Sequence, residues 1–404
     1  MNIIEANKHY YQRSGADRYI FGLTDLLESH GHNVIPFAMQ HRENRSTPWS
    51  KYFPPYVQTR QPKLSLDGLK TFKRMIYSRE AKCNMAALIR DARPDLAHIH
   101  NIYTQLSPSI LDALSAAKVP TVMTVHDYHL VAPNYSLWAH GKIEDWSQPG
   151  LVRSTLSKFH KNSYAASFAQ SLMFKLHRQW KIYQKNIDHF IPPSEFVRQR
   201  MIESGFEADK ITTIPHFIDL SGVEPKKEED DEGYVLFVGR FVEEKGAEVL
   251  IRAMSELPDV PCKLLGAGPD EGRLRDWAAG HGNIEFLGWQ KGGVPWDLYR
   301  KARVVVVPSI WYEVFGLVAL EAMAVGTPVI ASEIGGLTEV VDDGQTGRLV
   351  PPGDVQALKM AIEDMMDNKK HALELGRAGR TKVETEYSPE LHYEQIIKVF
   401  QSVL

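Results

Sequence analysis

Two glutamates stand eight residues apart in the stretch WYEVFGLVALEAMAVGTPVIAS, residues 311–332. Glu313 lies shortly before a glycine, and Glu321 lies in a run that is otherwise almost wholly apolar. Burying a carboxylate in such a run is costly unless the group is paired or hydrogen-bonded. The pattern predicts a strand that ends near Ser309 and a helix that begins at Gly316–Leu317. Free amides at a helix start attract anions, and a carboxylate accepts hydrogen bonds from sugar or ribose hydroxyls. The alternative makes Glu321 a salt-bridged core residue and Glu313 a solvated loop charge.

Two cations in the stretch VLFVGRFVEEKGAEVLI, residues 235–251, suit a diphosphate. A predicted strand runs into Arg240, and Lys245 follows just before a predicted helix. Arginine grips a diphosphate as a fork and lysine acts on it as a point charge. Either residue alone could equally be an ordinary surface charge. The glycine turn LLGAGP, residues 264–269, would let a flat base approach the backbone at Gly268.

Alternating strands and helices must position these groups. Short β-rich runs such as MNIIEA and PTVMTVHD alternate with amphipathic helices, which is typical of βαβ units with parallel sheets. The charged segment 221–233 predicts a linker, because it lacks apolar periodicity and YVLFVG restarts the alternation after it. We expect two doubly wound α/β domains, residues 1–220 and 234–385, with a final helix 386–404 that could pack back on the first. Ligands of such domains lie at the carboxyl ends of the strands, so a cleft between the domains is the expected site.

Composition favours a globular cytoplasmic protein. The 404 residues are 43% hydrophobic and 24% charged, and no apolar run reaches the roughly 18–20 residues of a membrane span. The N-terminus resembles no export signal, and Cys83 and Cys262 fit no metal or redox spacing. Residues 1–220 hold 27 Lys and Arg against 19 Asp and Glu, whereas the remainder holds 20 against 31. An anionic partner for the basic half is expected, and no motif indicates nucleic acid.

The pattern ExFGxxxxEAMAxGxPV, preceded by GRxxxxKG and GxGP, resembles the retaining glycosyltransferases of family 4 (glycosyl transferases group 1). Nearly the whole chain shares the resemblance, and the segments suggest the type that builds bacterial envelope glycans or exopolysaccharide. It implies a GT-B fold, two Rossmann-like domains with the nucleotide sugar on the second. It also implies a hexosyltransferase that retains anomeric configuration without a cofactor or divalent metal. The chain has no D-x-D pair at a strand end, which agrees with that expectation.

The resemblance also implies roles for single residues. Arg240 and Lys245 match the family's diphosphate clamp, and Glu321 matches the carboxylate on the ribose. Glu313 and the backbone of Phe315, Gly316 and Leu317 match the group around the donor sugar and distal phosphate, and the Leu287 backbone matches a contact to the base. In the first half, the matching residues are His126 beside the transferred sugar, Gly15 in the loop SGADR near the donor phosphates, and Arg18 and Asn101 near the acceptor. The loop has Ser14 where the family has a glycine, and His126 could instead be a core or turn residue.

The substrates stay open at the level of the sequence. We expect a UDP- or GDP-sugar donor and a glycan or lipid-linked acceptor, and neither sugar nor linkage can be named. Residues 151–187 contain seven Lys and Arg and no Asp or Glu, interleaved with aromatic residues. They predict either a basic amphipathic helix on an anionic membrane surface or a core-packed helix with a solvated basic face. Rival functions are another GT-B enzyme, such as a sugar-nucleotide epimerase or α-glucan phosphorylase, and a non-catalytic subunit that binds nucleotide sugar or membrane. A nucleotide-cofactor dehydrogenase fits worst, because no G-x-G-x-x-G follows the first strand.

Overall fold

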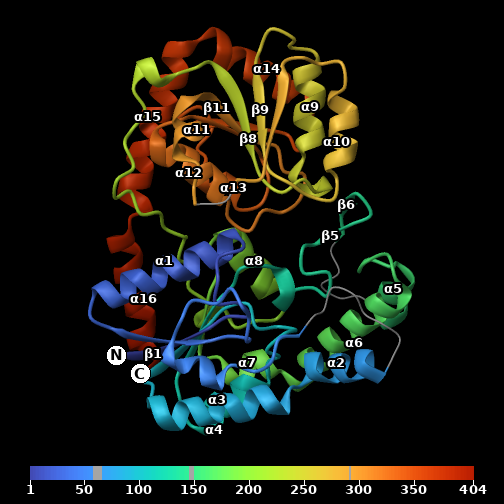
Figure 1. The fold of residues 1–404 in the computed structure, drawn as a ribbon, viewed down its shortest axis with the longest axis vertical. Helices are drawn as coiled ribbons and strands as arrows, with labels where there is room; N and C mark the ends of the chain where they lie inside the picture. Colours follow the sequence, from blue (N-terminus) through green and yellow to red (C-terminus); the bar gives the residue numbers. More distant parts are fainter. Residues whose placement is uncertain (58–65, 145–149, 291–292) are drawn as a thin grey trace. The chain divides into compact units, whose positions relative to one another are not determined.

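The computed structural model describes residues 1–57, 66–144, 150–290 and 293–404. The chain forms two compact units, each built on its own parallel sheet (Figure 1). The first unit comprises Met1–Ala139, Glu144–Ile214 and His392–Leu404, and the second comprises His140–Ile143 and Pro215–Leu391. Two parallel α/β sheets are what the alternation of strands and helices predicts.

The sheet of the first unit has the strand order β2-β1-β3-β4-β7. All its strands are parallel and short, and most of their residues are buried, as expected for a sheet covered on both faces. The strands are β1 (Asn2–Ala6), β2 (Asn33–Phe37), β3 (Leu96–Ile99), β4 (Thr121–Thr124) and β7 (His189–Ile191). The helices are α1 (Gly15–Ser29), α2 (Leu66–Ile76), α3 (Arg79–Ala92), α4 (Ser109–Ala116), α5 (Leu151–Leu156), α6 (Tyr164–Trp180), α7 (Ile182–Asn186), α8 (Glu195–Glu203) and α16 (Pro389–Val403), and a small hairpin is formed by β5 (Trp138–Ala139) and β6 (Lys142–Ile143).

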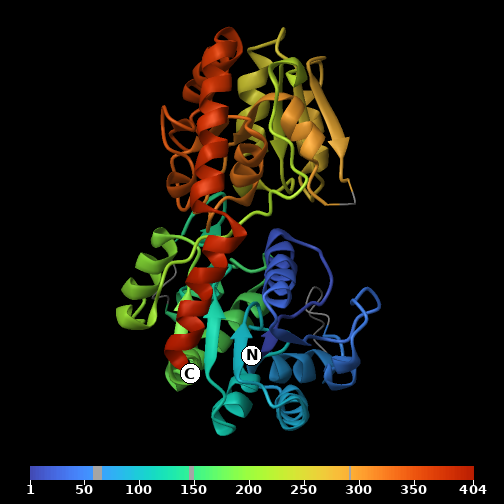
Figure 2. The same ribbon diagram turned by 90° about the vertical axis from the view of Figure 1, so that its left-hand side faces the viewer.

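The C-terminal helix α16 packs against the first unit from His392 onward, beside α1 (Figures 1 and 2). The Tyr393 ring stacks on His30 at 3.6 Å between centroids, and Phe400 meets the ring of His98 edge-on at 5.3 Å. Phe400 is fully buried. The helix thus supplies part of the hydrophobic core of this unit, although 177 residues of the second unit, Pro215–Leu391, precede it in the chain.

The sheet of the second unit has the order β10-β9-β8-β11-β12-β13 and is also parallel. One core lies against α11, α12 and α13, and another against α9, α10 and α14; Figure 1 shows α9 and α10 on the opposite side of the sheet from α11 and α12. The strands are β8 (Tyr234–Val238), β9 (Cys262–Leu265), β10 (Ile284–Gly288), β11 (Ala302–Val307), β12 (Val329–Ser332) and β13 (Gly347–Val350). The helices are α9 (Ala247–Ser255), α10 (Glu271–Ala278), α11 (Trp296–Lys301), α12 (Leu317–Val325), α13 (Leu337–Val340), α14 (Val355–Asp367) and α15 (Lys369–Glu386).

The segment 221–233, expected to be a linker, belongs to the second unit, and the division between the units falls at Ile214 and Pro215. Lys226 lies 3.7 Å from Asp231, and both side chains are almost fully buried. Arg303 at the start of β11 also pairs with Asp231. Burial lowers the pKa of Lys226 to about 8, although the Asp231 carboxylate opposes that shift. Charged residues therefore hold this segment in place without any apolar periodicity.

Within the part of the chain that the structure describes, no helix combines the length and apolar character needed to cross a membrane.

Candidate active site

Glu313 lies in the loop between β11 and α12 and is held by two donors. Its Oε1 accepts hydrogen bonds from Lys245 Nζ at 2.6 Å and from Ser309 Oγ at 2.6 Å. Burial alone would raise the pKa of this carboxyl. The positive charge and hydrogen bond of Lys245, with the hydrogen bond from Ser309, outweigh burial and hold the pKa below its ordinary value. Glu313 is therefore an ionised, oriented carboxylate and not a solvated loop charge.

The two cations of the expected diphosphate clamp lie in the same loop, between β8 and α9, and differ in their contacts. Lys245 closes a short 3-10 turn, is 29% exposed and lies over the ring of Trp311 at 5.0 Å. Arg240 follows β8, is exposed, and forms no ion pair with any residue that the structure describes. Because β8 pairs with β11, this loop and the loop after β11, which carries Glu313, lie at the same carboxyl edge of the sheet. One cation is therefore fixed by Glu313 and the other can swing toward a ligand.

Glu321 is buried in α12, at 4% exposure. Its Oε2 accepts a 2.7 Å hydrogen bond from the hydroxyl of Tyr299, a fully buried residue of α11. The sequence reading did not single out this tyrosine. A carboxylate only accepts hydrogen bonds, so the Tyr299 hydroxyl is the donor in this contact and orients the group.

The start of α12 depends on Gly316. This residue caps the helix with φ +119° and ψ +50°, a conformation that only glycine adopts readily. Its neighbour Leu317 is the first helical residue, so the amides of this turn point out of the helix end. The side chain of Phe315 is buried against His216 and Tyr387, which leaves only its backbone for a ligand.

A glycine pair from the next loop packs against the Glu313 segment. A Cβ on Gly335 would lie 2.4 Å from the Glu313 carbonyl oxygen, and one on Gly336 would lie 2.6 Å from that of Val314. The Gly336 amide donates to the Glu313 carbonyl at 2.7 Å. The sequence EIGG indicates such a contact, since adjacent glycines after a strand often mark a close approach of two backbone segments. Our sequence analysis does not predict this contact.

The residues expected near the base lie at the same edge of the sheet. Gly268 follows β9, and its loop is tied to Phe241 by a hydrogen bond from the Phe241 amide to the Ala267 carbonyl at 3.0 Å. Leu287 lies in β10, partly exposed, beside the end of β9. Since β10, β9, β8 and β11 are successive neighbours, the sheet brings the second unit's expected donor residues to one edge.

His126 lies just beyond β4 at the carboxyl edge of the first sheet. Its Nε2 is 3.0 Å from Nδ1 of His100, and the Tyr19 ring meets it edge-on at 5.5 Å. It is partly buried, and these two partners come from α1 and from the segment just after β3.

The other residues expected in the first unit lie nearby in the fold. Gly15 is the first residue of α1, after Ser14, whose φ of −142° is ordinary extended backbone. The Ser14 hydroxyl donates to Asp17, so a serine replaces the family glycine here without strain. Arg18 lies one turn into α1 and is partly buried. Asn101 is 6% exposed, and its buried Oδ1 has no hydrogen-bond partner among the described residues, which is compatible with a ligand contact.

A fully buried cluster behind His126 was not anticipated. Glu5 accepts from His98 at 2.9 Å and from His100 at 2.5 Å. The three side chains lie close enough for an ion, within 4.8 Å, but their contacts have hydrogen-bond geometry. Glu5 and His98 are register partners, and residues two apart on a strand share a face. The sequence showed Glu5 in MNIIEA and both histidines in DLAHIH, but only the strand order makes them neighbours.

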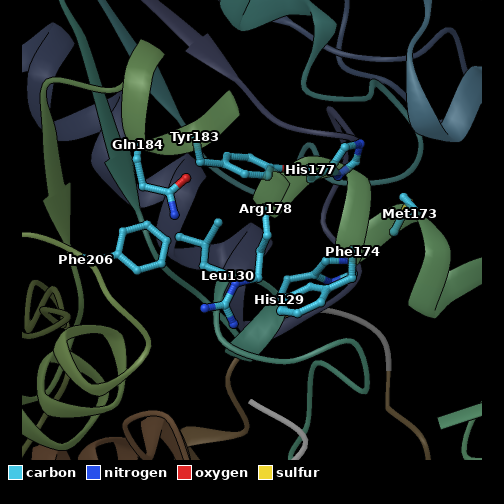
Figure 3. A pocket seen from close by; sticks show the side chains of 9 residues that line it. All are labelled: His129, Leu130, Met173, Phe174, His177, Arg178, Tyr183, Gln184 and Phe206. Carbon is cyan, nitrogen blue, oxygen red and sulfur yellow. The ribbon is translucent and has the colours of Figure 1, made fainter. Parts of the chain in front are cut away.

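A small cavity in the first unit lies under α6 and α7 (Figure 3). His129, Phe174, Arg178 and Phe206 are among its lining residues. Its volume of about 20 Å³ suits about one water molecule and is far too small for a sugar. It is not a candidate substrate site.

Comparisons with known proteins identify the family of the chain. The family description Glycosyltransferase Family 4 matches residues 13–221, and Glycosyl transferases group 1 matches residues 223–382. Phosphatidyl-myo-inositol mannosyltransferase of Mycobacterium leprae is 26% identical over 396 residues, covering 96% of this chain and 93% of that protein. An uncharacterized glycosyltransferase of Methanocaldococcus jannaschii is 38% identical over 146 residues, only 35% of this chain and 37% of that protein.

Among solved structures, Anabaena HepE in complex with UDP and glucose superposes with a TM-score of 0.69 at 18% identity, covering 99% of each chain. A likeness at this identity speaks for the fold, and it confirms the two Rossmann-like domains of a GT-B protein. The family 4 description spans more than half of the chain, and the group 1 description covers most of the remainder. The chain therefore belongs to the family 4 glycosyltransferases and is a glycosyltransferase of GT-B fold.

Proposed function

We propose that this glycosyltransferase moves a hexose from a UDP- or GDP-sugar to a glycan or lipid-linked acceptor, with retention of anomeric configuration and without a divalent metal. The product would serve cell-envelope polysaccharide synthesis. The observation that carries the proposal is the cationic and carboxylate group at the edge of the second sheet, with Lys245 fixed by Glu313 and Arg240 exposed beside it.

The charges of that group suit the leaving diphosphate. Arg240, Lys245 and the amides at the start of α12 would stabilise the negative charge that grows as the bond to the sugar breaks. Glu321, oriented by Tyr299, would accept hydrogen bonds from the ribose hydroxyls. In the first unit, His126 would orient the transferred sugar or the acceptor through a hydrogen bond, and it need not act as a base.

The relatives support the substrate classes without fixing them. The relative from Mycobacterium leprae is named for mannose transfer to phosphatidyl-myo-inositol, a lipid acceptor. The Anabaena structure contains UDP and glucose. A nucleoside-diphosphate sugar and a glycan or lipid-linked acceptor are therefore reasonable classes to test first.

A panel of UDP- and GDP-sugars in a thermal-shift assay tests donor binding, because a ligand that binds the native state stabilises it. The expected result is a rise in melting temperature with one base and one sugar above the rest. Arg240→Ala should abolish most of that rise, because it removes the exposed cation. No response to any donor of the panel would contradict the proposal.

Measuring the products formed from the donor distinguishes a transferase from an epimerase and from a non-catalytic binding subunit. A transferase releases nucleoside diphosphate in proportion to acceptor, whereas an epimerase converts the donor without an acceptor, and a binding subunit does neither. Transfer should persist undiminished in EDTA, because no metal is proposed. Loss of activity in EDTA that Mg²⁺ or Mn²⁺ restores would contradict that part.

The surface of residues 150–187 supports an anionic membrane as a further partner. The helix α6 buries one face, including Met173, Phe174 and His177. Apolar side chains nevertheless stay exposed alongside basic ones, and no acidic residue interrupts them. The exposed apolar residues are Val152, Leu156, Tyr164, Phe168 and Trp180. The segment thus has a core-packed face, as the second alternative expects, and its other face mixes apolar and basic residues, which supports the proposal of a membrane partner.

Vesicles of phosphatidylglycerol and phosphatidylcholine test this surface by flotation at low and high salt. Binding that needs the anionic lipid and weakens with salt is expected, because screening shortens the reach of the lysines. Phe168→Ser with Trp180→Ser should weaken it, whereas Trp277→Ser, an equally exposed tryptophan of α10, should not. Equal binding to neutral vesicles, or none at low salt, would remove the membrane from the proposal.

A further inference from the structure

The buried carboxylate of Glu5 is connected to His126 through one histidine. His100 Nε2 lies 2.5 Å from Glu5 Oε2, and its other nitrogen, Nδ1, lies 3.0 Å from Nε2 of His126. His98 forms a parallel branch from the same carboxylate, with Nδ1 on Glu5 and Nε2 on Thr124 Oγ1 at 2.7 Å. The two branches share their origin, but only the one through His100 reaches His126.

Hydrogen-bond chemistry assigns the protons along the His100 branch. An ionised carboxylate only accepts, so each histidine nitrogen that faces Glu5 must carry a proton. A neutral His100 protonated on Nε2 has a bare Nδ1, which can only accept. The Nε2 of His126 must then be the donor, and in the neutral ring its Nδ1 is left without a proton.

The reverse order of protons needs a charge state that the surroundings disfavour. If His100 Nδ1 donated to His126, either Glu5 would have to be protonated or His100 would have to be a cation. The pKa of Glu5 lies below its ordinary value, because the charges and hydrogen bonds of His98 and His100 outweigh its burial. Burial and the neighbouring His98 lower the pKa of His100 to about 4, so it is neutral at pH 7.

We propose that Glu5 and His100 are positioning residues that lock His126 in the tautomer protonated on Nε2, so that its Nδ1 can only accept a hydrogen bond. The Tyr19 ring, edge-on to both His100 and His126, keeps the two imidazoles from turning out of line. Tyr19 is in turn held by a 3.0 Å hydrogen bond to His392 of α16.

The lock determines what His126 can recognise. A bare Nδ1 can only accept a hydrogen bond, so its partner must be a donor, such as a hydroxyl group of a sugar, whereas the other tautomer would present an N–H to an oxygen. This consequence rests on the proposed function, in which His126 contacts the transferred sugar or the acceptor. The tautomer itself does not, and it can be measured without substrate.

The test uses the full ¹⁵N-labelled chain and a long-range proton–nitrogen NMR spectrum, which reports the protonation of each imidazole nitrogen. The chain has 16 histidines, so the signals of His126 are assigned by their loss in His126→Asn. The expected spectrum of the unaltered protein at pH 7 has His126 protonated on Nε2 and bare at Nδ1.

Two matched variants show whether the lock runs through His100. His98 and His100 are both fully buried and both bound to Glu5. His100→Phe removes the acceptor and should leave His126 as a mixture of tautomers. His98→Phe removes an equivalent contact and should leave its Nε2 tautomer unchanged. In transfer assays, His100→Phe should lower kcat about tenfold, the size of one misdirected hydrogen bond, with the donor KM little altered.

The outcomes that overturn the proposal are distinct from those that overturn the function. His126 protonated on Nδ1 in the unaltered chain refutes the lock, as does an equal response of its tautomer to both variants. Signals of His98 and His100 that change on adding EDTA would show an ion in place of the hydrogen bonds and also refute it. Should the Nε2 tautomer be found while no donor is ever turned over, the lock stands and the proposed function fails.

Discussion

At the residue scale, Glu313 and Lys245 form the most informative pair in the second unit. Their 2.6 Å contact holds a carboxylate charged inside the protein and fixes a cation beside the start of α12. Removing either partner leaves the other without its counter-charge. If Lys245 binds the donor as proposed, the pair links donor binding to local stability.

Lys245→Met should cost about 3 kcal/mol of unfolding free energy at pH 7, the low end for breaking a buried ion pair, since Lys245 is partly exposed. The pKa of Glu313 lies below its ordinary 4.5, so the stability it contributes is present above pH 4.5 and is lost as pH falls through the lowered value. Urea titrations should show the difference between the two proteins shrinking below about pH 4.5.

The matched control is Lys301→Met, whose 2.9 Å partner Glu232 is well exposed. An exposed pair contributes about 0–1 kcal/mol, so this variant should stay near the unaltered protein at every pH. Equal costs for the two lysines would contradict the special role of Lys245.

Glu321→Gln should weaken donor binding about tenfold by calorimetry, because a neutral amide is a poorer partner for two ribose hydroxyls. Tyr299→Phe removes only the hydrogen bond inside the chain and should cost about 1 kcal/mol of stability with a smaller effect on affinity. If both variants lose stability and neither loses affinity, Glu321 is a structural residue.

Sequence reasoning could find the residues that carry unusual chemistry in their local context, and it could not find their partners. Glu313, Glu321 and Lys245 stand out because charge interrupts apolar runs or precedes a predicted helix. Ser309 and Tyr299 give no such signal, because serine and tyrosine are ordinary at strand ends and in helices. Glu5 and His98 are 93 residues apart, and only the strand order β1-β3 makes them neighbours.

At the element scale, the start of α12 is the part of the fold that depends most on one residue. A Cβ on Gly316 would lie 2.7 Å from Cδ2 of Leu337, and its φ is strained for any other residue. Gly326 ends the same helix with φ +82°, yet a Cβ there would meet nothing closer than 3.7 Å.

The two glycines of α12 therefore form a matched pair. Gly316→Ala should cost about 2 kcal/mol of unfolding free energy, against about 1 kcal/mol for Gly326→Ala. Both substitutions strain the backbone, and only the Cβ at position 316 would also overlap a neighbouring side chain. Only Gly316→Ala should also weaken donor affinity, since it moves the helix start. Thermal melts measure the stability of the two variants, and calorimetric titration measures their donor affinity. Equal losses of affinity would contradict the proposal that the donor binds at this helix end.

Elements were predictable where the apolar period was clear. The apolar runs RVVVVPS and YVLFVG predict β11 and β8, and LVALEAMAVG predicts α12. The segment 221–233 gives no such signal, because its contacts in the second unit come from the buried pair Lys226 and Asp231 and not from an apolar stripe. Charge pairing of this kind has no period, so a pattern search misses it.

At the scale of the whole molecule, the chain has two units with separate sheets and cores, so each unit should unfold in its own transition. We expect two transitions in scanning calorimetry, and the donor should raise that of the second unit more than that of the first. At a free donor concentration of 100 times Kd the gain is about 2.7 kcal/mol. Arg240→Ala should remove the shift, whereas Arg198→Ala on the exposed face of α8 should not. A single transition that moves as a whole would contradict this independence.

The C-terminal helix α16 has a consequence for synthesis on the ribosome. A nascent chain usually completes its N-terminal domain first. Here the first unit needs residues 392–404, which leave the exit tunnel after the whole of the second unit. Until they emerge, Tyr19 lacks His392 and His98 lacks Phe400, so the first unit stays incomplete while the second can already fold.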